Sequence, residues 1–331
     1  MRENVLLRDH TTFHIGGPAR YFIEVKNISE LRESVDFAHK KKLPILILGG
    51  GSNMLVSDRG FNGVVIRLRF FGFEINEERV KISASENWDE CARRIVEHGL
   101  WGIENLSFVP GDAAGLAIQN VGAYGQEARN AIEYVEVYDT IANVECRMTN
   151  EECKFRYRQS IFNTEKRGQY VILSVTLKLS KKGAPNTSYG VKADSLAGMR
   201  EAIIAVRKSK GQDPSEYHSA GSFFKNPIIT EKQYAALGPG VPRYPADGGV
   251  KIPAGYLLDK ICNLKGLTVG GAKLSELQVI NIINFNNATA SDALNLFKKA
   301  RDTVFAKTGI MLENEPELIG FTDLERSLPS L

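Results

Sequence analysis

The stretch "LPILILGGGSNMLVSD", residues 43–58, decides the fold. Its apolar run is too short for a helix, and three glycines interrupt it before it resumes, which predicts a strand, a tight loop and a second strand. Consecutive glycines allow positive φ and close approach of the backbone, so the N–H groups of residues 49–53 can point into one concavity and bind a pyrophosphate. A hairpin turn is the alternative interpretation of this loop.

Helix and strand signals alternate around this loop. Asn27 followed by Glu30 predicts the start of one helix, and Asn87 with Gly99 predicts the start and the end of another. The runs "VVIRL" and "VKISAS" predict short strands, because they are apolar and rich in β-branched residues. This order predicts a mixed α and β architecture for the first third of the chain.

A second glycine-rich stretch, "VPGDAAGLAIQNVGAYGQEA", occupies residues 109–128. We expect a second backbone loop at residues 110–125 that can also hold a phosphate, because one folded unit seldom needs two such runs for turns alone. The spacings G-x-x-x-x-G-K-[ST] and G-x-G-x-x-G do not occur, so neither the P-loop nor the Rossmann fingerprint is present.

The pattern changes toward the C-terminus. Residues 181–194 form a polar excursion, residues 195–210 return to a helical period, and the chain from about residue 218 predicts a separate α+β domain. Helical segments are expected in that domain at 254–261, 274–284 and 292–307. The predicted domains are residues 1–70, 71–215 and 216–331.

Composition limits the possible partners. The chain has 331 residues, 43% hydrophobic and 24% charged, with a formal net charge of +3. This small and scattered excess of positive charge argues against a nucleic-acid binder and favours small-molecule partners. No apolar run approaches the length of a membrane helix and no secretory signal is visible, so we expect a cytoplasmic protein without membrane contact. The four cysteines are expected to be reduced and buried, and the five histidines form no metal-binding pattern.

Seven segments carry a resemblance to a known family: "TTFHIGGPARYF", "ILGGGSNMLVSD", "ENLSFVPGDAAGLAIQNVGAYG", "FRYRQSIF", "AGSFFKNP", "AGYLLDKICNLKGLTVGGAKLSELQVINIIN" and "LENEPELIG". In this order they resemble the UDP-N-acetylenolpyruvoylglucosamine reductases, flavoenzymes that make UDP-N-acetylmuramate for bacterial peptidoglycan. The resemblance spans nearly the whole chain. It implies an α+β fold of the vanillyl-alcohol-oxidase type, in which two subdomains hold FAD and a separate C-terminal α+β domain binds the substrate.

The resemblance also implies the cofactors. FAD would be held without a covalent bond, because "GGGSNM" offers no histidine or cysteine for attachment, and NADPH would be the co-substrate. The implied FAD contacts are Gly49, Gly50, Gly51, Ser52, Asn53, Gly111, Gly115, Gln119, Asn120, Gly122 and Tyr157. One departure stands out, because this chain has "VPGDAAGLAIQN" where the family has a sequence like "IPGTVGASPIQN". The added carboxylate of Asp112 must point away from the phosphates or weaken their binding by repulsion.

The implied reaction adds a hydride and a proton across a C=C bond beside a carboxylate, which spreads negative charge toward that carboxylate. By the resemblance, Arg158 binds this charge through two parallel hydrogen bonds, whereas the residues alone leave Arg156 an equal candidate. Ser222 is the implied proton donor. Lys225 either supplies part of the field that steadies the serine anion or is an ordinary solvated lysine.

The stretch "GIMLENEPELIG" offers three glutamates for one role. Alignment with the family assigns the catalytic role to Glu315, which would stabilise the enol as a protonated acid. Glu317 is the second candidate and Glu313 the third. Further substrate contacts are implied for Tyr189, Lys210, Asn226 and Gln278, and Tyr189 places the chain in the first class of the family, which carries a tyrosine-bearing loop.

The predicted function is therefore NADPH-dependent reduction of UDP-N-acetylglucosamine enolpyruvate by a flavoenzyme, expected to be a monomer. An alternative is an FAD-dependent oxidase of the same fold that acts on an alcohol or hydroxy acid, which would consume oxygen without NADPH. A second alternative is a flavin-free protein that binds nucleotide sugars, which would be colourless when purified.

Overall fold

The strands on either side of the three glycines form as predicted, but they belong to different sheets. Strand β3 (Ile45–Leu48) pairs in parallel with β5 (Phe61–Leu68). Strand β4 (Met54–Val56) pairs in parallel with β20 (Glu317–Ile319), near the other end of the chain. The alternative of a hairpin turn is therefore wrong, and the glycine loop carries the chain from one sheet to another.

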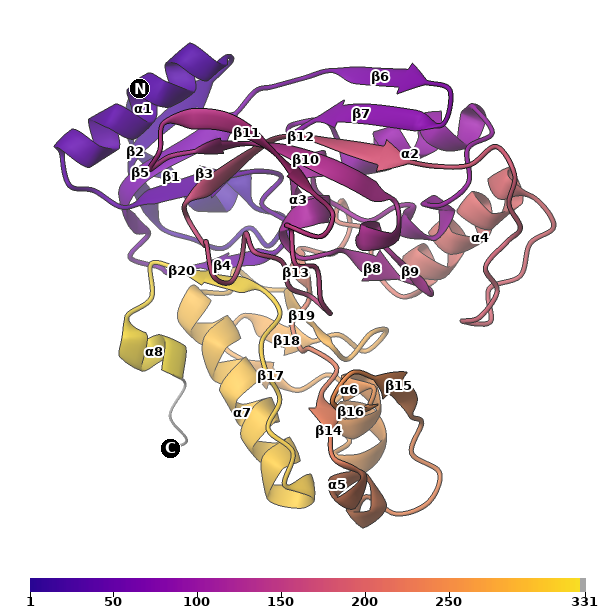
Figure 1. Cartoon of the computed structure of the whole chain (residues 1–331). Helices are drawn as coiled ribbons and strands as arrows, with labels where there is room; N and C mark the ends of the chain where they lie inside the picture. Colours follow the sequence, from indigo (N-terminus) through magenta and orange to yellow (C-terminus); the bar gives the residue numbers. More distant parts are fainter. Residues whose placement is uncertain (328–331) are drawn as a thin grey trace. The chain divides into compact units, whose positions relative to one another are not determined.

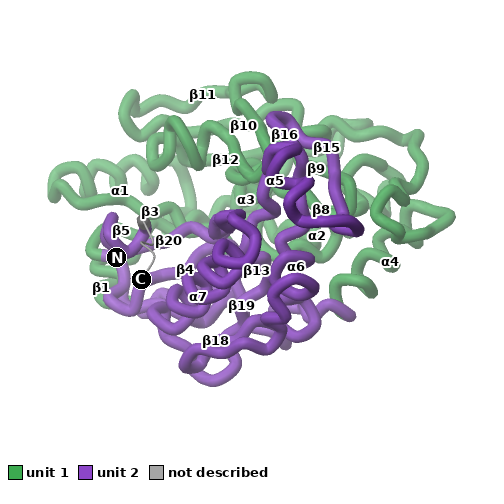
Figure 2. The backbone as a smooth tube through the Cα atoms, turned by 90° about the horizontal axis from the view of Figure 1, so that it is seen from below, with its two compact units in different colours: residues 1–5, 19–50, 62–208 green, residues 6–18, 51–61, 209–331 purple. Residues whose placement is uncertain are grey.

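The computed structural model describes residues 1–327, and the chain divides into two compact units. Figure 1 shows the elements along the chain, and Figure 2 colours unit 1 green and unit 2 purple. Unit 1 consists of residues 1–5, 19–50 and 62–208, and unit 2 of residues 6–18, 51–61 and 209–331. The predicted domain boundaries at residues 70 and 215 stay a prediction.

The first sheet has the strand order β1-β2-β5-β3, with β1 at Arg2–Leu6 and β2 at Pro18–Val25. Helix α1 (Ile28–Lys40) begins as predicted, because the Asn27 side chain accepts a hydrogen bond from the Glu30 N–H at 2.9 Å. The Glu30 carboxylate in turn accepts from the N–H of Lys26 at 2.7 Å. Helix α1 buries Leu31, Val35 and Ala38 on one face.

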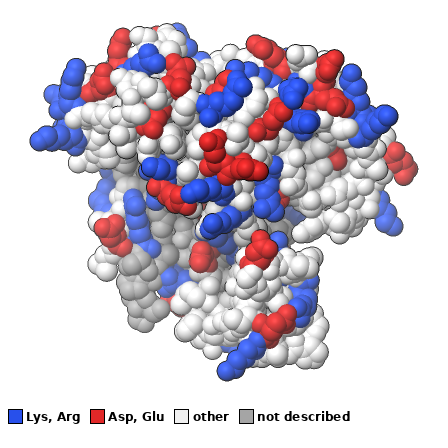
Figure 3. All heavy atoms as spheres, viewed as in Figure 1, with Lys and Arg blue, Asp and Glu red and all other residues white. Residues whose placement is uncertain are grey.

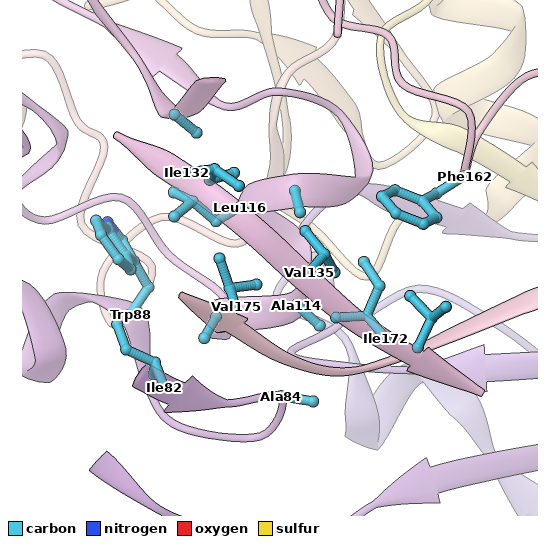
Figure 4. Packing of buried hydrophobic residues seen from close by; sticks show 14 of the residues in the cluster. Ile82, Ala84, Trp88, Ala114, Leu116, Ile132, Val135, Phe162, Ile172 and Val175 are labelled. Carbon is cyan, nitrogen blue, oxygen red and sulfur yellow. The ribbon is translucent and has the colours of Figure 1, made fainter. Parts of the chain in front are cut away.

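The second sheet of unit 1 is antiparallel, with the order β11-β10-β12-β7-β6. Its strands are β6 (Phe73–Asn76), β7 (Arg79–Ser83), β10 (Ile132–Asp139), β11 (Val144–Thr149) and β12 (Tyr170–Lys178). Helix α2 (Trp88–Glu97) starts after the Asn87 cap, and Gly99 follows it with a φ of +72°. Figure 4 shows Val135 and Val175 of the sheet in one cluster with Trp88 of α2.

The second glycine-rich stretch is not a loop throughout, contrary to the prediction. It contains helix α3 (Ala113–Ile118) and a short hairpin of β8 (Gly122–Ala123) and β9 (Gln126–Glu127). Asp112 caps α3 by accepting the Gly115 N–H at 3.0 Å, and the apolar side chain of Leu116 is buried. The sequence analysis treated Asp112 as a charge near phosphates and missed its role as a helix cap.

Unit 1 ends in α4 (Leu196–Ser209) and contains short 3-10 turns at Glu104–Leu106 (η2) and Ala128–Asn130, whereas the 3-10 turn at Leu7–His10 belongs to unit 2. Unit 2 has a sheet of order β13-β19-β18-β17 and a smaller one of order β14-β16-β15. These strands are β13 (Ser219–Ser222), β14 (Ile228–Ile229), β15 (Tyr244–Ala246), β16 (Gly249–Lys251), β17 (Thr268–Val269), β18 (Ala272–Leu274) and β19 (Asn281–Asn284). Its helices are α5 (Glu231–Ala236), α6 (Ala254–Tyr256), which continues as a π-helix (Leu257–Ile261), α7 (Ala290–Thr308) and α8 (Asp323–Ser327).

The predicted helix at residues 274–284 is wrong. These residues form the end of β18, a turn and strand β19. The run Val279–Ile283 is dense in β-branched residues, which favour a pleated surface, and β13 and β18 pair with β19 on its two edges. Four apolar positions in so short a run fit a strand and a helix equally well by sequence alone.

Aromatic side chains hold the core of unit 2 together. Phe223 and Phe224, both buried, lie with ring centroids 5.4 Å and 5.0 Å from Phe297 of α7. Phe13 packs edge-on against Phe223 at 6.3 Å. The two adjacent phenylalanines of "AGSFFKNP" are therefore core anchors that both pack against the same helix residue.

The molecular surface carries charges of both signs. On the face drawn in Figure 3, Lys and Arg side chains alternate with Asp and Glu, without a broad area of one sign. Within the described part of the chain, no helix combines the length and the apolar character that crossing a membrane requires. The cysteines are unpaired, but Cys146 is exposed, so the prediction that all four are buried is wrong.

Candidate active site

Ser222 stands directly after a glycine that changes the register of its strand. Ser219 pairs with Ile283 and Ser222 with Asn281, with an irregularity between the two pairs. Gly221 lies there with a φ of +74°, a conformation that side chains rarely adopt. A Cβ at Gly221 would meet nothing within 4 Å, so the backbone conformation and not the available space calls for glycine.

The segment after Ser222 pairs with the segment that carries Glu315. The Glu315 N–H donates to the Phe223 carbonyl at 2.9 Å, and the Lys225 N–H donates to the Glu313 carbonyl at 2.9 Å. Phe224 forms an antiparallel bridge with Asn314. The structure thus brings Ser222 and Glu315, 93 residues apart by their numbers, onto adjoining segments of unit 2.

The three candidate glutamates have different surroundings. The side chain of Glu313 is 75% exposed and forms an ion pair with the Lys225 ammonium at 3.3 Å. Glu317 belongs to β20, and its N–H donates to the Asn53 carbonyl at 3.0 Å. Glu315 is half-buried between them. This pairing of Lys225 with Glu313 makes Lys225 a weak candidate for steadying a serine anion.

Three further residues of unit 2 were predicted to bind the substrate, and two of them are tied to neighbouring segments by hydrogen bonds. The Asn226 carbonyl oxygen Oδ1 accepts the Ala254 N–H at 2.9 Å, which ties it to the start of α6. The backbone carbonyl of Gln278 accepts the N–H of Asn281, the partner of Ser222, at 2.9 Å. Lys210 is half-buried in the turn that follows α4.

Arg158 lies in a tight turn of unit 1. Arg156 and Gln159 form an isolated bridge, so Tyr157 and Arg158 occupy the corner of this turn. Arg158 has a φ of +56°, which is uncommon for a non-glycine residue and concentrates at functional sites. Its guanidinium donates to the Gly122 carbonyl at 2.9 Å, whereas Arg156 is exposed.

Two asparagine side chains hold this turn. Nδ2 of buried Asn120 donates to the Arg156 carbonyl and to the Glu127 carboxylate, both at 3.0 Å, and its Oδ1 accepts the Arg129 N–H at 2.9 Å. Nδ2 of Asn163 donates to the Arg158 carbonyl at 3.2 Å. The Asn120 side chain, predicted as a cofactor contact, is therefore already bonded within the protein on both of its polar atoms.

Glycines bring the two glycine-rich stretches into contact within unit 1. A Cβ at Gly49 would lie 2.4 Å from the Asp112 carboxylate, and a Cβ at Gly50 would lie 2.8 Å from the Gly111 Cα. Glycine is thus needed at Gly50 because two backbones approach closely there, and at Gly49 because the Asp112 carboxylate packs against it. In unit 2, a Cβ at Gly51 would lie 2.2 Å from the His10 carbonyl oxygen. These contacts show that packing within the protein requires glycine at these positions, and their role in binding a pyrophosphate stays a prediction.

Asp112 connects the two glycine-rich stretches by hydrogen bonds. Its carboxylate accepts backbone N–H groups of Gly115 and Gly50, and these bonds favour the charged form. Loss of hydration is the larger effect and raises the pKa of Asp112 above its usual range. The carboxylate therefore lies against the Gly49–Gly50 backbone while it caps α3, and it accepts the N–H of Gly50, one of the groups predicted to bind the pyrophosphate.

The polar excursion at 181–194 rests on the β8–β9 hairpin. Nδ2 of Asn186 donates to the Gly125 carbonyl at 3.1 Å, and Tyr189, 48% exposed, follows three residues later. Nδ2 of Asn105 donates to the Asn186 carbonyl at 3.0 Å. Neither Asn105 nor Gly125 was predicted as a site residue, although both lie in the segment "ENLSFVPGDAAGLAIQNVGAYG" that resembles the family. Among residues 1–327, no cluster of His, Cys, Asp and Glu side chains could hold a metal ion.

Comparison with known proteins places this geometry in a class. Residues 19–144 match the FAD binding domain family, and residues 213–319 match the C-terminal domain family of UDP-N-acetylenolpyruvoylglucosamine reductase. The UDP-N-acetylenolpyruvoylglucosamine reductase of Pasteurella multocida is 37% identical to this chain, and the match covers 97% of this chain and 99% of the relative. The reductase of Neisseria gonorrhoeae is also 37% identical, and the match covers 96% of each chain. A crystal structure of the reductase from Thermus caldophilus matches 96% of this chain and 98% of its own with a TM-score of 0.71 and 28% identity.

The fold and the site thus define an α+β protein with an FAD-binding domain and a separate C-terminal α+β domain, and the predicted fold class is confirmed. The chain belongs to the UDP-N-acetylenolpyruvoylglucosamine reductase family. The resemblance inferred from the motifs is thereby confirmed. The roles of the individual site residues stay predictions.

Proposed function

We propose that the protein reduces UDP-N-acetylglucosamine enolpyruvate to UDP-N-acetylmuramate, with NADPH as the reductant and FAD as a non-covalently held cofactor. One observation carries the proposal: Ser222 and Glu315, the implied acids of the reaction, lie on paired segments of a chain that matches these reductases over nearly its full length. The peptidoglycan precursor pathway is the corresponding cellular role.

The phosphate-binding backbone would come from both glycine-rich stretches. Gly49, Gly50, Gly51, Ser52 and Asn53 would hold the FAD pyrophosphate together with Gly111, Gly115, Gln119 and Gly122. Tyr157, at the corner of the turn beside Arg158, would contact the ring system. When bound, FAD that NADPH has reduced would supply the hydride for the enolpyruvyl carbon.

The side chains of the protein would handle charge and proton. The Arg158 guanidinium would bind the substrate carboxylate and stabilise the negative charge that develops there. Ser222 would deliver the proton to the neighbouring carbon, and Glu315 would donate a hydrogen bond to the enol. Tyr189, Lys210, Asn226 and Gln278 would bind the UDP-sugar portion.

The decisive experiment is an assay of NADPH oxidation with purified protein and the enolpyruvyl sugar nucleotide. We expect oxidation that depends on the sugar nucleotide and a product heavier by two hydrogens. NADPH-independent oxygen consumption with an alcohol would instead identify an oxidase. A colourless protein that releases no flavin on denaturation would identify a binding protein.

Three secondary proposals accompany this function. Acid denaturation should release FAD into solution, because "GGGSNM" offers no attachment residue. The protein should run as a monomer by light scattering. It should be found in the cytoplasm by cell fractionation.

A further inference from the structure

Asn105 is a buried polar residue that joins three segments of unit 1. It lies in the turn η2, is fully buried, and its Nδ2 donates to the carbonyls of Tyr124 at 2.7 Å and Asn186 at 3.0 Å. Its backbone N–H donates to the Gln126 side chain at 2.7 Å. One side chain thus bonds both to the β8–β9 hairpin and to the 181–194 segment.

The hairpin and the 181–194 segment also touch directly. Gly125 has a φ of +84°, and a Cβ there would lie 2.5 Å from Ser188 Oγ and 3.1 Å from both Asn186 Nδ2 and Tyr189 Cδ2. The segment that carries Tyr189 therefore lies directly over a position where only glycine fits. Any shift of this hairpin turn shifts the backbone on which Tyr189 rests.

The same turn meets Arg158 at its other end. The Arg158 guanidinium donates to the Gly122 carbonyl, three residues before Gly125, at 2.9 Å. The turn at residues 122–125 is consequently a common support for the residue proposed to bind the substrate carboxylate and the residue proposed to bind the diphosphate. Asn105 bonds to the middle of this turn at Tyr124.

The amide of Asn105 serves this connection rather than core packing. Its Oδ1 is buried without a hydrogen-bond partner among the residues that the structure describes. An unsatisfied buried oxygen destabilises a fold, so an apolar side chain of similar size would suit the core better. Asn105 therefore contributes to the structure through the hydrogen bonds that its Nδ2 group donates to two separate segments.

We propose that Asn105 is a positioning residue that holds the 181–194 segment on the β8–β9 hairpin. By fixing the turn at residues 122–125, it would fix the positions of both Tyr189 and Arg158. This inference rests on the proposed function in two respects, namely that Tyr189 binds the UDP-sugar and that Arg158 binds the substrate carboxylate. Asn105 itself does not touch the substrate.

The test compares Asn105→Ala and Asn105→Asp with a matched control. Asn105→Asp keeps the shape but cannot donate as a carboxylate. The control is Asn150→Ala, because Nδ2 of Asn150 also donates to two backbone carbonyls, those of Arg129 and Ile132, both at 2.7 Å. Neither acceptor belongs to the 181–194 segment.

The first readout is tryptic cleavage at the exposed Lys181, Lys182 and Lys192, which requires no catalysis. We expect both Asn105 variants to be cleaved there about tenfold faster than wild type, which corresponds to the loss of one or two hydrogen bonds. The second readout is kinetic: KM for the sugar nucleotide should rise about tenfold, while the rate of flavin reduction by NADPH stays within about twofold. Asn150→Ala should match wild type in both.

Gly125→Ala is the second variant, in case the Asn105 variants fail to fold. Gly125 is exposed, so the substitution leaves the core intact, yet it should give the same rise in KM and in cleavage. Unchanged cleavage in all variants, or a fall in flavin reduction that parallels the rise in KM, would overturn the proposal. If wild type shows no sugar-dependent turnover, the proposed function fails, and the cleavage rates alone still decide whether Asn105 holds the segment.

Discussion

The surroundings of Ser222 in unit 2 and those of Arg158 in unit 1 are built in different ways. Ser222 and Glu315 are placed by backbone pairing between neighbouring segments, with Phe223 anchored in an aromatic core. Arg158 is placed by side-chain amides, chiefly Asn120 and Asn163, which hold a turn in an uncommon backbone conformation. Hydrogen bonds between backbones form with many different side chains, whereas a turn held by side-chain amides loses a hydrogen bond whenever one of those amides is replaced.

This difference predicts where single substitutions act. Around Ser222, only the reacting side chains and the glycine of the irregular pairing should be sensitive. Around Arg158, residues that never meet the substrate should matter, because they orient the guanidinium. The following predictions test this contrast, beginning with the largest expected effect.

Ser222→Ala should remove the proposed proton donor. Reduction of the flavin by NADPH should stay near the wild-type rate, and its reoxidation by the sugar nucleotide should slow by about 10³-fold, in the range that general acids contribute. Stopped-flow absorbance of the two half-reactions measures both rates separately. Equal losses in the two half-reactions would contradict the role of Ser222.

Glu315→Gln should slow the same reoxidation by about 10²-fold, because the amide keeps the shape but cannot act as an acid. Glu317→Gln is the matched control, since Glu317 lies two residues further on in β20. If the Glu317 variant shows the loss and the Glu315 variant does not, the assignment is wrong by two residues.

Asn120→Ala should release the turn of Arg158 in unit 1. The buried amide makes three hydrogen bonds, so we expect a loss of about 2 kcal/mol in the free energy of unfolding and about tenfold in kcat/KM for the sugar nucleotide. Urea unfolding and steady-state kinetics measure these effects. Asn62→Ala, which loses one exposed contact with Arg20, serves as the control. An unchanged kcat/KM would show that the amide does not orient Arg158.

Gly221→Ala should have the smallest effect on stability. The positive φ at this position costs an alanine about 1 kcal/mol, and no neighbour obstructs the new Cβ. Urea unfolding should show this loss, together with a few-fold slower reoxidation by the sugar nucleotide as Ser222 shifts. Gly99→Ala controls for the conformation alone, because its φ is +72° and it also has no neighbour within 4 Å. If Gly221→Ala lowered the rate of reaction with the sugar nucleotide more than Asn120→Ala does, the proposed contrast between the two regions would be wrong.

Local signals in the sequence predicted much of this fold. The Asn27 and Asn87 caps and the strands around the three glycines follow from short-range rules and are confirmed. The family followed from the order of motifs, because several weak signals in a fixed order become specific.

Contacts between distant segments could not be predicted in this way. The pairing of β4 with β20 joins residues far apart in the chain, and nothing near Met54 indicates its partner. Residues 274–284 were misassigned because strand partners, absent from a local window, decide between helix and strand. The role of Asn105 could not be predicted, since it depends on hydrogen bonds to two carbonyls in other segments.

The central claim is that Arg158, Ser222 and Glu315 act on one substrate. A crystal structure of the oxidised FAD-containing protein with the enolpyruvyl sugar nucleotide, without NADPH, tests it most directly. We predict Ser222 Oγ within about 3.2 Å of the carbon that receives the proton or linked to it by one water, and the Arg158 guanidinium bonded to the substrate carboxylate. A bound substrate whose carboxylate meets neither Arg158 nor Glu315, with Ser222 turned away, would contradict the account.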